Sequence, residues 1–332
     1  MNPTFFIYGV SVKILSIFIA LIFCACSSNW SSEKNQALLQ DAKENFEALQ
    51  TNQINTTKYQ SRIDLGKKLY FEKKLSANGT LSCNSCHNLE NYGVDNEKTS
   101  PGFDGTRGGR NSPTVYNSAI HLAQFWDGRA KDVEEQALGP LLNPIEHGLK
   151  SQKQTMKILK DAGYLPLFKK AFKGYKFPFT FKNIGRAIGA YEKTLMTPSR
   201  FDDFLNGDIT ALSSSEKRGL SKFIEVGCVN CHNGMGIGGE TYQKLGLEVP
   251  YPTNDKGRYE ITKDKDDMFV FKVPSLRNVA KTYPYFHDGH INNLNSAITI
   301  MGKHQLNVKL SNREVNDIKT FLGSLTAKEL KF

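Results

Sequence analysis

Residues 82–90 read SCNSCHNLE, and residues 227–234 read GCVNCHNG. Both stretches place two cysteines two residues apart and follow the second cysteine directly with a histidine. The six positions are Cys83, Cys86 and His87 in the first stretch and Cys228, Cys231 and His232 in the second. The pattern is too specific for ordinary core residues, so it is the natural starting point for the chain.

Two thiols at this spacing with an adjacent histidine are the attachment pattern of a c-type haem. Each thiol adds to one vinyl group of the porphyrin, and the neighbouring imidazole is thereby held against the iron as its proximal ligand. A zinc site built from all four thiolates and a thioredoxin-like dithiol are the alternatives. Neither explains why a histidine follows the second cysteine in both copies. We therefore predict two covalently bound haem c groups, with His87 and His232 as proximal ligands.

The first 25 residues differ from the rest of the chain. The run IYGVSVKILSIFIALIFCA carries only one charge, Lys13, and the sequence becomes polar directly after Cys26. This favours an export signal of the lipoprotein kind, with Cys26 as the lipidated first residue of the mature chain. An uncleaved anchor helix and a plain secretory signal remain alternatives. All three place the folded part outside the cytoplasm, and we expect a periplasmic protein held to a membrane through a lipid anchor only.

Composition sets broad limits. The chain has 332 residues, enough for two domains, with 39% hydrophobic residues, 23% charged residues and a formal net charge of +10. The lysines and arginines are scattered along the chain and form no single stripe, so no nucleic-acid partner is expected. The mature chain stays basic, which favours an acidic docking partner.

A second feature is also duplicated. PTVYNSAIHLAQFWDG, from Pro113, aligns without gaps on PSLRNVAKTYPYFHDG, from Pro274, at a constant offset of 161 residues. Each copy follows its own haem motif, so we predict an internal duplication of one haem domain. The identical residues are Pro113, Asn117, Ala119, Phe125, Asp127 and Gly128, which match Pro274, Asn278, Ala280, Phe286, Asp288 and Gly289.

Apolar residues recur at helical spacing in several segments, such as 184–195 and 315–325. Ser213 with Glu216, and Ser311 with Glu314, are capping-box starts for two of these helices. The predicted fold is therefore mainly α, with two cytochrome c-like haem domains in tandem. The expected divisions are a signal at 1–25, a tether and surface helix at 26–57, and haem domains at 58–203 and 204–332.

The sixth iron ligand distinguishes a haem that reacts from a haem that only conducts electrons. A histidine–methionine pair closes the coordination sphere and raises the potential, whereas a histidine alone leaves a position open for a small molecule. Met301, in AITIMGKHQL, is the strongest candidate methionine by its position in the second domain.

At this level of detail the chain resembles the bacterial di-haem cytochrome c peroxidases, a family related to the methylamine-utilisation di-haem enzymes. The likeness follows the order of the chain and covers most of its mature part. It runs through LGKKLYFEKKLSANGTLSCNSCHN, NSPTVYN, QFWDGRAKDVEEQALGPLLNPIEHG, GCVNCHNG, VPSLRNVAKTYPYFHDG, IMGKHQL and FLGSLT.

The resemblance implies a role for particular residues. His87 would hold the peroxidatic haem, with Gln136 and Glu146 as the amide and acid of its distal pocket. Trp126 would lie between the haems, and His232 with Met301 would be the axial pair of the electron-transfer haem. Taken alone, the glutamate could be an exposed acid, the glutamine a helix-surface amide and the tryptophan a core residue.

The resemblance also implies one calcium ion at the domain junction. Its ligands would be Asn111 and the backbone carbonyls of Thr282 and Pro284, and oxygen ligands suit a hard cation. Without the resemblance, Asn111 before Ser-Pro reads as an ordinary turn residue. Dimers are common among the relatives, so a homodimer is a further expectation.

Two residues depart from the family pattern. Many relatives carry a histidine in the loop after the first haem motif, where it blocks the open iron position until the second haem is reduced. Here that place holds Phe103, which cannot ligate iron, so we predict activity without reductive activation. His147 stands where relatives have methionine next to the acid, and it could tune the pocket or serve as a replacement ligand.

The predicted activity is cytochrome-c peroxidase: reduction of hydrogen peroxide with electrons from a small periplasmic cytochrome c or a cupredoxin. One alternative is a di-haem protein that only transfers electrons. Another is a di-haem enzyme that oxidises a protein substrate, although such relatives tend to replace the methionine ligand by tyrosine.

Overall fold

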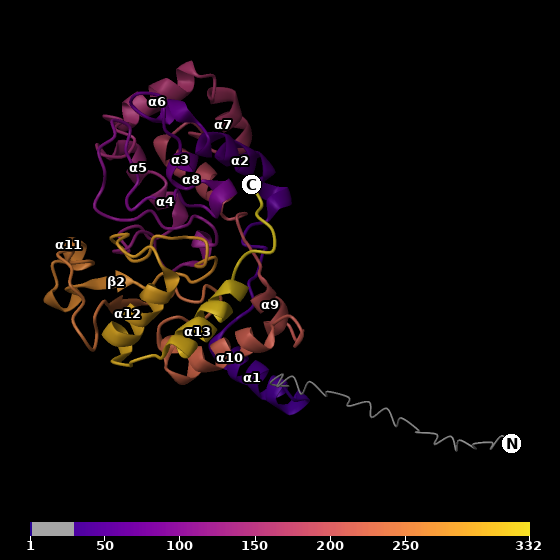
Figure 1. The fold of residues 1–332 in the computed structure, drawn as a ribbon. Helices are drawn as coiled ribbons and strands as arrows, with labels where there is room; N and C mark the ends of the chain where they lie inside the picture. The colour runs from indigo at the N-terminus through magenta and orange to yellow at the C-terminus, as the bar shows by residue number, and fades with distance from the viewer. Residues whose placement is uncertain (2–29) are drawn as a thin grey trace.

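The computed structural model describes Met1 and residues 30–332, and its fold is mainly helical (Figure 1). The predicted signal from residue 2 onward and the lipidation site Cys26 lie outside the described residues. Within the described part, no helix is both long and apolar enough to span a bilayer.

The α-helices are α1 (Ser32–Asn45), α2 (Thr56–Tyr70), α3 (Cys83–Cys86), α4 (Val133–Gln136), α5 (Gly139–Leu142), α6 (Gln152–Asp161), α7 (Leu165–Ala171), α8 (Phe181–Glu192), α9 (Arg200–Leu205), α10 (Ser214–Glu225), α11 (Tyr259–Thr262), α12 (Leu294–Leu306) and α13 (Asn312–Ser324). Two short strands, β1 (Tyr242–Lys244) and β2 (Val270–Lys272), pair antiparallel. The 3-10 turns are η1 (Lys73–Leu75), η2 (Leu89–Asn91), η3 (Ser118–Ile120), η4 (Cys228–Asn230) and η5 (Lys265–Asp267).

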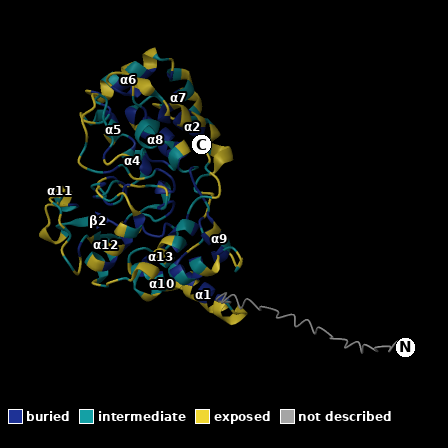
Figure 2. Ribbon diagram, viewed as in Figure 1, coloured by how far each residue is buried: buried dark blue, intermediate teal, exposed yellow. Residues whose placement is uncertain are grey.

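The buried apolar side chains form two separate clusters. The first cluster runs from Ile63 to Leu195, and the second takes most of its members from Phe201 to Leu325. Figure 2 shows buried residues inside both halves and exposed residues on the outer faces of the helices. Two apolar cores confirm the prediction of a mainly helical chain with two cytochrome c-like units. The exact border at 203/204 stays a prediction, although Phe201 already packs in the second core.

Each core is built on one pair of crossing helices, α2 with α8 and α10 with α13. A glycine permits the close approach in both pairs. A Cβ on Gly66 would come within 1.9 Å of the carbonyl oxygen of Ala187, and a Cβ on Gly219 would come equally close to that of Asp317. Because both helix pairs use the same device, the two domains share one packing plan. The capping boxes predicted at the starts of α10 and α13 are present.

The duplicated sequence motif has the same backbone conformation in both copies. Asn117 and Asn278 have φ angles of 61° and 64°, and Phe125 and Phe286 have φ angles of 65° and 68°. These are left-handed values that residues other than glycine adopt rarely. The side-chain amides of the two asparagines meet at one acceptor, because both Nδ2 groups donate to Oγ1 of Thr197, at 2.8 and 3.0 Å. The structure therefore confirms the internal duplication.

Both ends of the described chain cross to the other domain (Figure 1). Helix α1 packs its apolar face, including Leu38 and Leu39, into the second core. At the opposite end, Leu330 packs against the first core, and the carbonyl of Lys331 accepts a hydrogen bond from the hydroxyl of Tyr116. These crossings hold the two domains, and hence their haem motifs, in one relative position.

Candidate functional site

The first haem motif lies on the single helical turn α3. Ser82 and Ser85 form a capping box at its start, and His87 follows its last residue. The imidazole Nδ1 lies 3.0 Å from the carbonyl oxygen of Pro113, and the hydroxyl of Tyr70 donates to the carbonyl of His87 at 2.6 Å. Burial lowers the pKa of His87, so the ring is neutral and Nδ1–H donates to Pro113. The lone pair on Nε2 is thereby left for a metal.

The second haem motif covers η4 and the two residues that follow it. Burial lowers the pKa of His232 to about 4, and its Nδ1 is buried without a hydrogen-bond partner among the described residues. A Cβ on Gly238, at φ 104°, would come 2.4 Å from the carbonyl oxygen of Pro274 and 3.0 Å from Nδ1 of His232. Glycine is required there so that the chain can pass the imidazole. The neutral ring is in the state that binds iron.

The four thiols are free, and no disulfide joins them. Burial raises the pKa of Cys228 to about 12 and that of Cys86 to about 11, and it raises those of Cys83 and Cys231 as well. A redox-active dithiol needs a free thiolate, which such burial disfavours. The described residues also contain no group of three or more His, Cys, Asp or Glu side chains that could hold a metal ion. These observations oppose the zinc and dithiol alternatives.

A cavity of about 250 Å³ lies beside the second haem motif. Cys228, Cys231 and His232 line it together with Met301 of α12, and the rest of the wall is mainly apolar. Thiols for attachment, a neutral imidazole and a thioether therefore share one apolar space, which is the donor set of a closed haem site. Met301 therefore lines the same cavity as His232, and its role as an iron ligand stays a prediction.

A second cavity, of about 260 Å³, lies in the first domain beside α4 and α5. Glu146 is its predicted catalytic acid, and it shares the wall with Asn143 and Arg129. The other lining residues are Phe125, Ala130, Glu135, Gly139 and Pro140. The wall of this cavity therefore combines charged and polar groups with apolar side chains.

The carboxyl of Glu146 is held in a defined orientation. Nδ2 of Asn143 donates to its Oε1 at 2.8 Å, while Oδ1 of the same asparagine accepts from the backbone N–H of Ile145 at 3.0 Å. Burial raises the pKa of Glu146, and the nearby Arg129 guanidinium and the Asn143 hydrogen bond oppose that rise. A carboxyl with a raised pKa suits an acid or base that works near neutral pH.

Three other residues were considered for the first haem site: Gln136, Phe103 and His147. Gln136 is half-buried at the end of α4 and is not among the residues that line this cavity. Phe103 lies against the loop that carries the acid: its N–H donates to the carbonyl of Glu146 at 2.9 Å, and its ring fills the space beside Gly148. The imidazole of His147 is buried, with Nδ1 2.7 Å from the carbonyl of Leu75.

Trp126 and the three residues predicted for calcium meet at the domain junction. Trp126, Asn111, Thr282 and Pro284 all line the cavity of the second haem motif. The indole Nε1 donates to the carbonyl of Asn111 at 2.9 Å. The side-chain amide nitrogen of Asn111 donates to the carbonyls of Glu97 and Lys98 at 3.0 and 3.4 Å, and its Oδ1 accepts no hydrogen bond from the described residues.

Sequence reasoning missed two groups of the first cavity, Asn143 and Arg129. The turn signal Asn-Pro at 143–144 was available, but only the fold shows that the asparagine amide reaches Glu146. The Arg129 guanidinium lies 3.4 Å from the ring centroid of Phe125 and donates to Asp127 at 2.9 Å. Nothing in its sequence neighbourhood points to a cavity.

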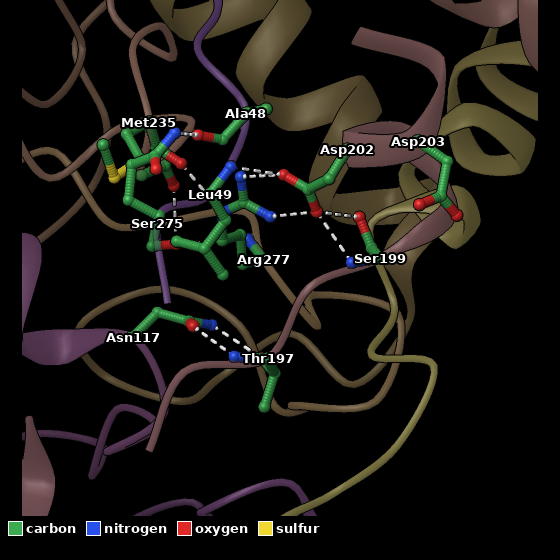
Figure 3. A network of polar contacts seen from close by, with 12 residues as sticks. Ala48, Leu49, Asn117, Thr197, Ser199, Asp202, Asp203, Met235, Ser275 and Arg277 are labelled. Atoms are coloured by element: carbon green, nitrogen blue, oxygen red, sulfur yellow. Dashed lines mark hydrogen bonds and ion pairs between the residues drawn. The ribbon is translucent and has the colours of Figure 1, made fainter. Parts of the chain in front are cut away.

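A buried ion pair fixes the loop that follows the second haem motif (Figure 3). Arg277 is fully buried and donates to Asp202 at 2.8 and 3.0 Å, and its Nε donates to the carbonyl of Met235 at 2.8 Å. Asp202 also accepts from the backbone N–H of Leu49 and from Ser199, both at 2.7 Å. The carboxylate of Asp202 in α9 is therefore linked to the segment after α1 and, through Arg277, to the loop after the second haem motif.

Comparison with known proteins gives a consistent result. Residues 60–210 match the family described as di-haem cytochrome c peroxidase. The chain is 46% identical over 274 residues to the cytochrome c551 peroxidase of Pseudomonas aeruginosa, covering 80% of this chain and 79% of that protein. It is also 46% identical over 272 residues to the cytochrome c551 peroxidase of Nitrosomonas europaea, covering 81% of each. A solved structure of a MauG-like protein associated with microbial copper homeostasis shares 31% identity and a TM-score of 0.74, covering 81% of this chain and 90% of that one.

Proposed function

Because the chain belongs to the di-haem cytochrome c peroxidase family and is a peroxidase, we propose that it reduces hydrogen peroxide to water with electrons from a small cytochrome c or a cupredoxin. The family binds two haem c groups, and the two Cys-x-x-Cys-His motifs would hold them here. When bound, the haems supply one iron at which peroxide is reduced and a second iron through which electrons enter.

One observation carries the proposal. Glu146 stands in a cavity of the first domain with its Oε1 held by Asn143 and with a pKa raised by burial. Such a carboxyl would accept a proton from one oxygen of hydrogen peroxide and return it to the other oxygen, which would leave as water. The hydrogen bond from Asn143 keeps the acceptor oxygen in place between the two transfers. The overall reaction takes two electrons and two protons per peroxide and yields two waters.

The second domain supports the electron supply. His232 and Met301 line one cavity, so these two side chains would hold the second haem iron, which would then transfer electrons and not bind peroxide. Trp126 lines the same cavity and belongs to the first copy of the duplicated motif, and it is therefore our candidate for the contact between the two sites. Gln136 stays a candidate for orienting peroxide, although it is not among the residues that line the first cavity.

The function is tested by mixing the haem-loaded protein with hydrogen peroxide and a panel of reduced small cytochromes c and one cupredoxin. We expect oxidation of two carriers for each peroxide consumed. The proposal is wrong if a protein with both haems attached oxidises no carrier of the panel and consumes no peroxide, because an electron-transfer protein would behave in that way.

We also propose that the enzyme needs no reductive activation. Phe103 has no ligating atom, and its backbone N–H and its ring are both held beside the 146–148 loop. The oxidised protein should therefore show a high-spin ferric signal from the first haem in its EPR spectrum and react with peroxide directly in stopped-flow mixing. An oxidised protein with only low-spin haem contradicts this.

His147 is the residue to vary in that experiment. Its Nδ1 is held by the Leu75 carbonyl, and burial lowers its pKa, so its Nε2 is an unprotonated potential ligand. The variant His147→Met restores the residue of the relatives. If it converted a low-spin first haem to high spin, His147 would be the ligand and the absence of activation would be refuted.

Three further features complete the proposed function. A calcium ion would bind Oδ1 of Asn111 and the carbonyls of Thr282 and Pro284, to which no described group donates.

Export to the periplasm and lipidation at Cys26 would place the enzyme at a membrane surface. Trp30, four residues after Cys26, donates to the carbonyl of Ser214, so the folded part would begin close to the anchor.

A further inference from the structure

The two copies of the duplicated motif meet through reciprocal contacts. The backbone N–H of Asn111 donates to the carbonyl of His287 at 2.7 Å, and the N–H of Lys272 donates to the carbonyl of Trp126 at 2.8 Å. At the offset of 161 residues, Asn111 corresponds to Lys272 and Trp126 corresponds to His287. The rings of Trp126 and His287 also face each other edge to face at 6.4 Å. The junction is therefore approximately two-fold symmetric.

The same symmetry relates the proposed calcium site to a second place in the molecule. Thr282, whose carbonyl is a proposed ligand, corresponds to His121, so the counterpart of the Asn111–Thr282 pair is Lys272 with His121. The structure brings those two together, with Nζ of Lys272 3.5 Å from Nδ1 of His121. The second repeat therefore has the ammonium group of Lys272 at the position where the first repeat has the amide oxygen of Asn111, a proposed calcium ligand.

This ammonium group has no counter-charge in the part of the chain that the structure describes. Lys272 is 8% exposed and lines the cavity that contains Cys231 and His232. No carboxylate lies within ion-pair distance of it among residues 30–332. Burial lowers the pKa of Lys272 to about 8, and burial also lowers the pKa of His121, so the imidazole beside the ammonium group is neutral. Burying a charge without a partner is costly, so a bound anion beside Lys272 would stabilise the charged lysine.

We propose that Lys272 is the counter-ion of a carboxylate of the second haem, and that it supplies from the protein the positive charge that a metal ion supplies at the symmetric position. The inference rests on the proposed haem site of the second domain. A haem carries two carboxylates, and they are the anions this cavity is expected to receive. A fixed positive charge beside this haem would favour its reduced state, so Lys272 would raise the potential of the haem that takes up electrons.

The test is a spectroelectrochemical titration of both haems in Lys272→Met, Lys272→Arg and the wild type. Lys244→Met is the control, because Lys244 is an exposed lysine on the neighbouring strand β1. We expect Lys272→Met to change the equilibrium between the oxidised and reduced second haem about tenfold toward oxidised, a fall of about 59 mV for a one-electron couple. Arginine keeps the charge, so Lys272→Arg and the control should stay at the wild-type potential. An unchanged potential in Lys272→Met overturns the proposal.

Haem content separates a charge effect from a packing effect. If Lys272→Met attaches less haem at the second motif while Lys272→Arg loads normally, the requirement for a positive charge is supported. If both variants fail to load, the residue acts through packing and the proposal is wrong. A wild-type chain without haem at the second motif would instead refute the proposed function. Calcium titration of the wild type and Asn111→Ala tests the metal site separately.

Discussion

Replacing Glu146 by glutamine should lower turnover with hydrogen peroxide about 10²–10⁴-fold while both haem groups keep their spectra. The amide has nearly the same shape, and its oxygen can still accept the hydrogen bond that Asn143 donates to Oε1. It cannot accept a proton and return it, so only the transfer step is lost. A variant with normal turnover would show that Glu146 is an ordinary cavity carboxyl.

A matched control lies in the same cavity. Glu135 is exposed, and its Oε2 accepts from the backbone N–H of Lys131 at 2.9 Å. Glu135→Gln makes the same chemical change 11 positions earlier in the chain and should keep wild-type turnover. If both variants were equally slow, a general loss of negative charge in the cavity would explain the defect.

The pH profile gives a second readout of Glu146. Burial raises its pKa above the ordinary value for glutamate, so the carboxylate that accepts the first proton is lost as the pH falls through that raised value. The rate constant kcat/KM of the wild type should therefore fall on the acid side at a higher pH than an exposed glutamate would produce. Glu146→Gln should lack that acid limb.

Replacing Arg277 by methionine should lower the free energy of unfolding by about 3–5 kcal/mol, because it leaves the buried carboxylate of Asp202 without its partner. Burial raises the pKa of Asp202, but the pairing with Arg277 and hydrogen bonds from Leu49 and Ser199 outweigh it, so the pKa is lowered in the folded protein. Denaturant unfolding of the haem-loaded protein, followed by circular dichroism, measures the loss.

The neighbouring carboxylate provides the control for Arg277. Asp203 pairs with Lys328 at 2.8 Å, but both side chains are well exposed, so Lys328→Met should cost about 1 kcal/mol or less. A loss for Arg277→Met as small as this would contradict the assignment of Asp202 as a charged, buried partner.

The Arg277 variant also has a predictable pH dependence. In the wild type the lowered pKa of Asp202 contributes stability above the unfolded pKa, and that stability is lost as the pH falls through the folded value. Without Arg277, burial becomes the dominant influence and raises the pKa of Asp202. The difference between variant and wild type should therefore shrink in acid, where Asp202 is protonated in both proteins.

Much of the fold was predictable because the decisive signals are local. A Cys-x-x-Cys-His run needs only one turn of chain, and a capping box such as Ser311 with Glu314 needs four residues. The duplication is equally a property of the sequence, since two gapless copies must adopt similar backbones. The left-handed φ angles shared by Phe125 and Phe286 follow from that identity.

The surroundings of the site could not be predicted in the same way. The hydrogen bond from Asn143 to Glu146 spans only three residues, yet whether the pair faces a cavity depends on α4, α5 and the chain near Phe125. The buried partners Asp202 and Arg277 are 75 residues apart, and either alone reads as a surface charge. Partners so far apart in the chain produce no periodic pattern in the sequence.

The sequence alone therefore determined the haem attachment motifs, the helical class and the doubled domain, and it predicted the residue types that would hold the irons, because these depend on neighbours along the chain. Tertiary structure decided which groups share a cavity: Met301 with His232, Asn143 with Glu146, and Lys272 with the second haem motif. The physical reason is that burial and pairing energies depend on distances in space. Only the packing of α1, the two cores and the C-terminal tail against one another sets those distances.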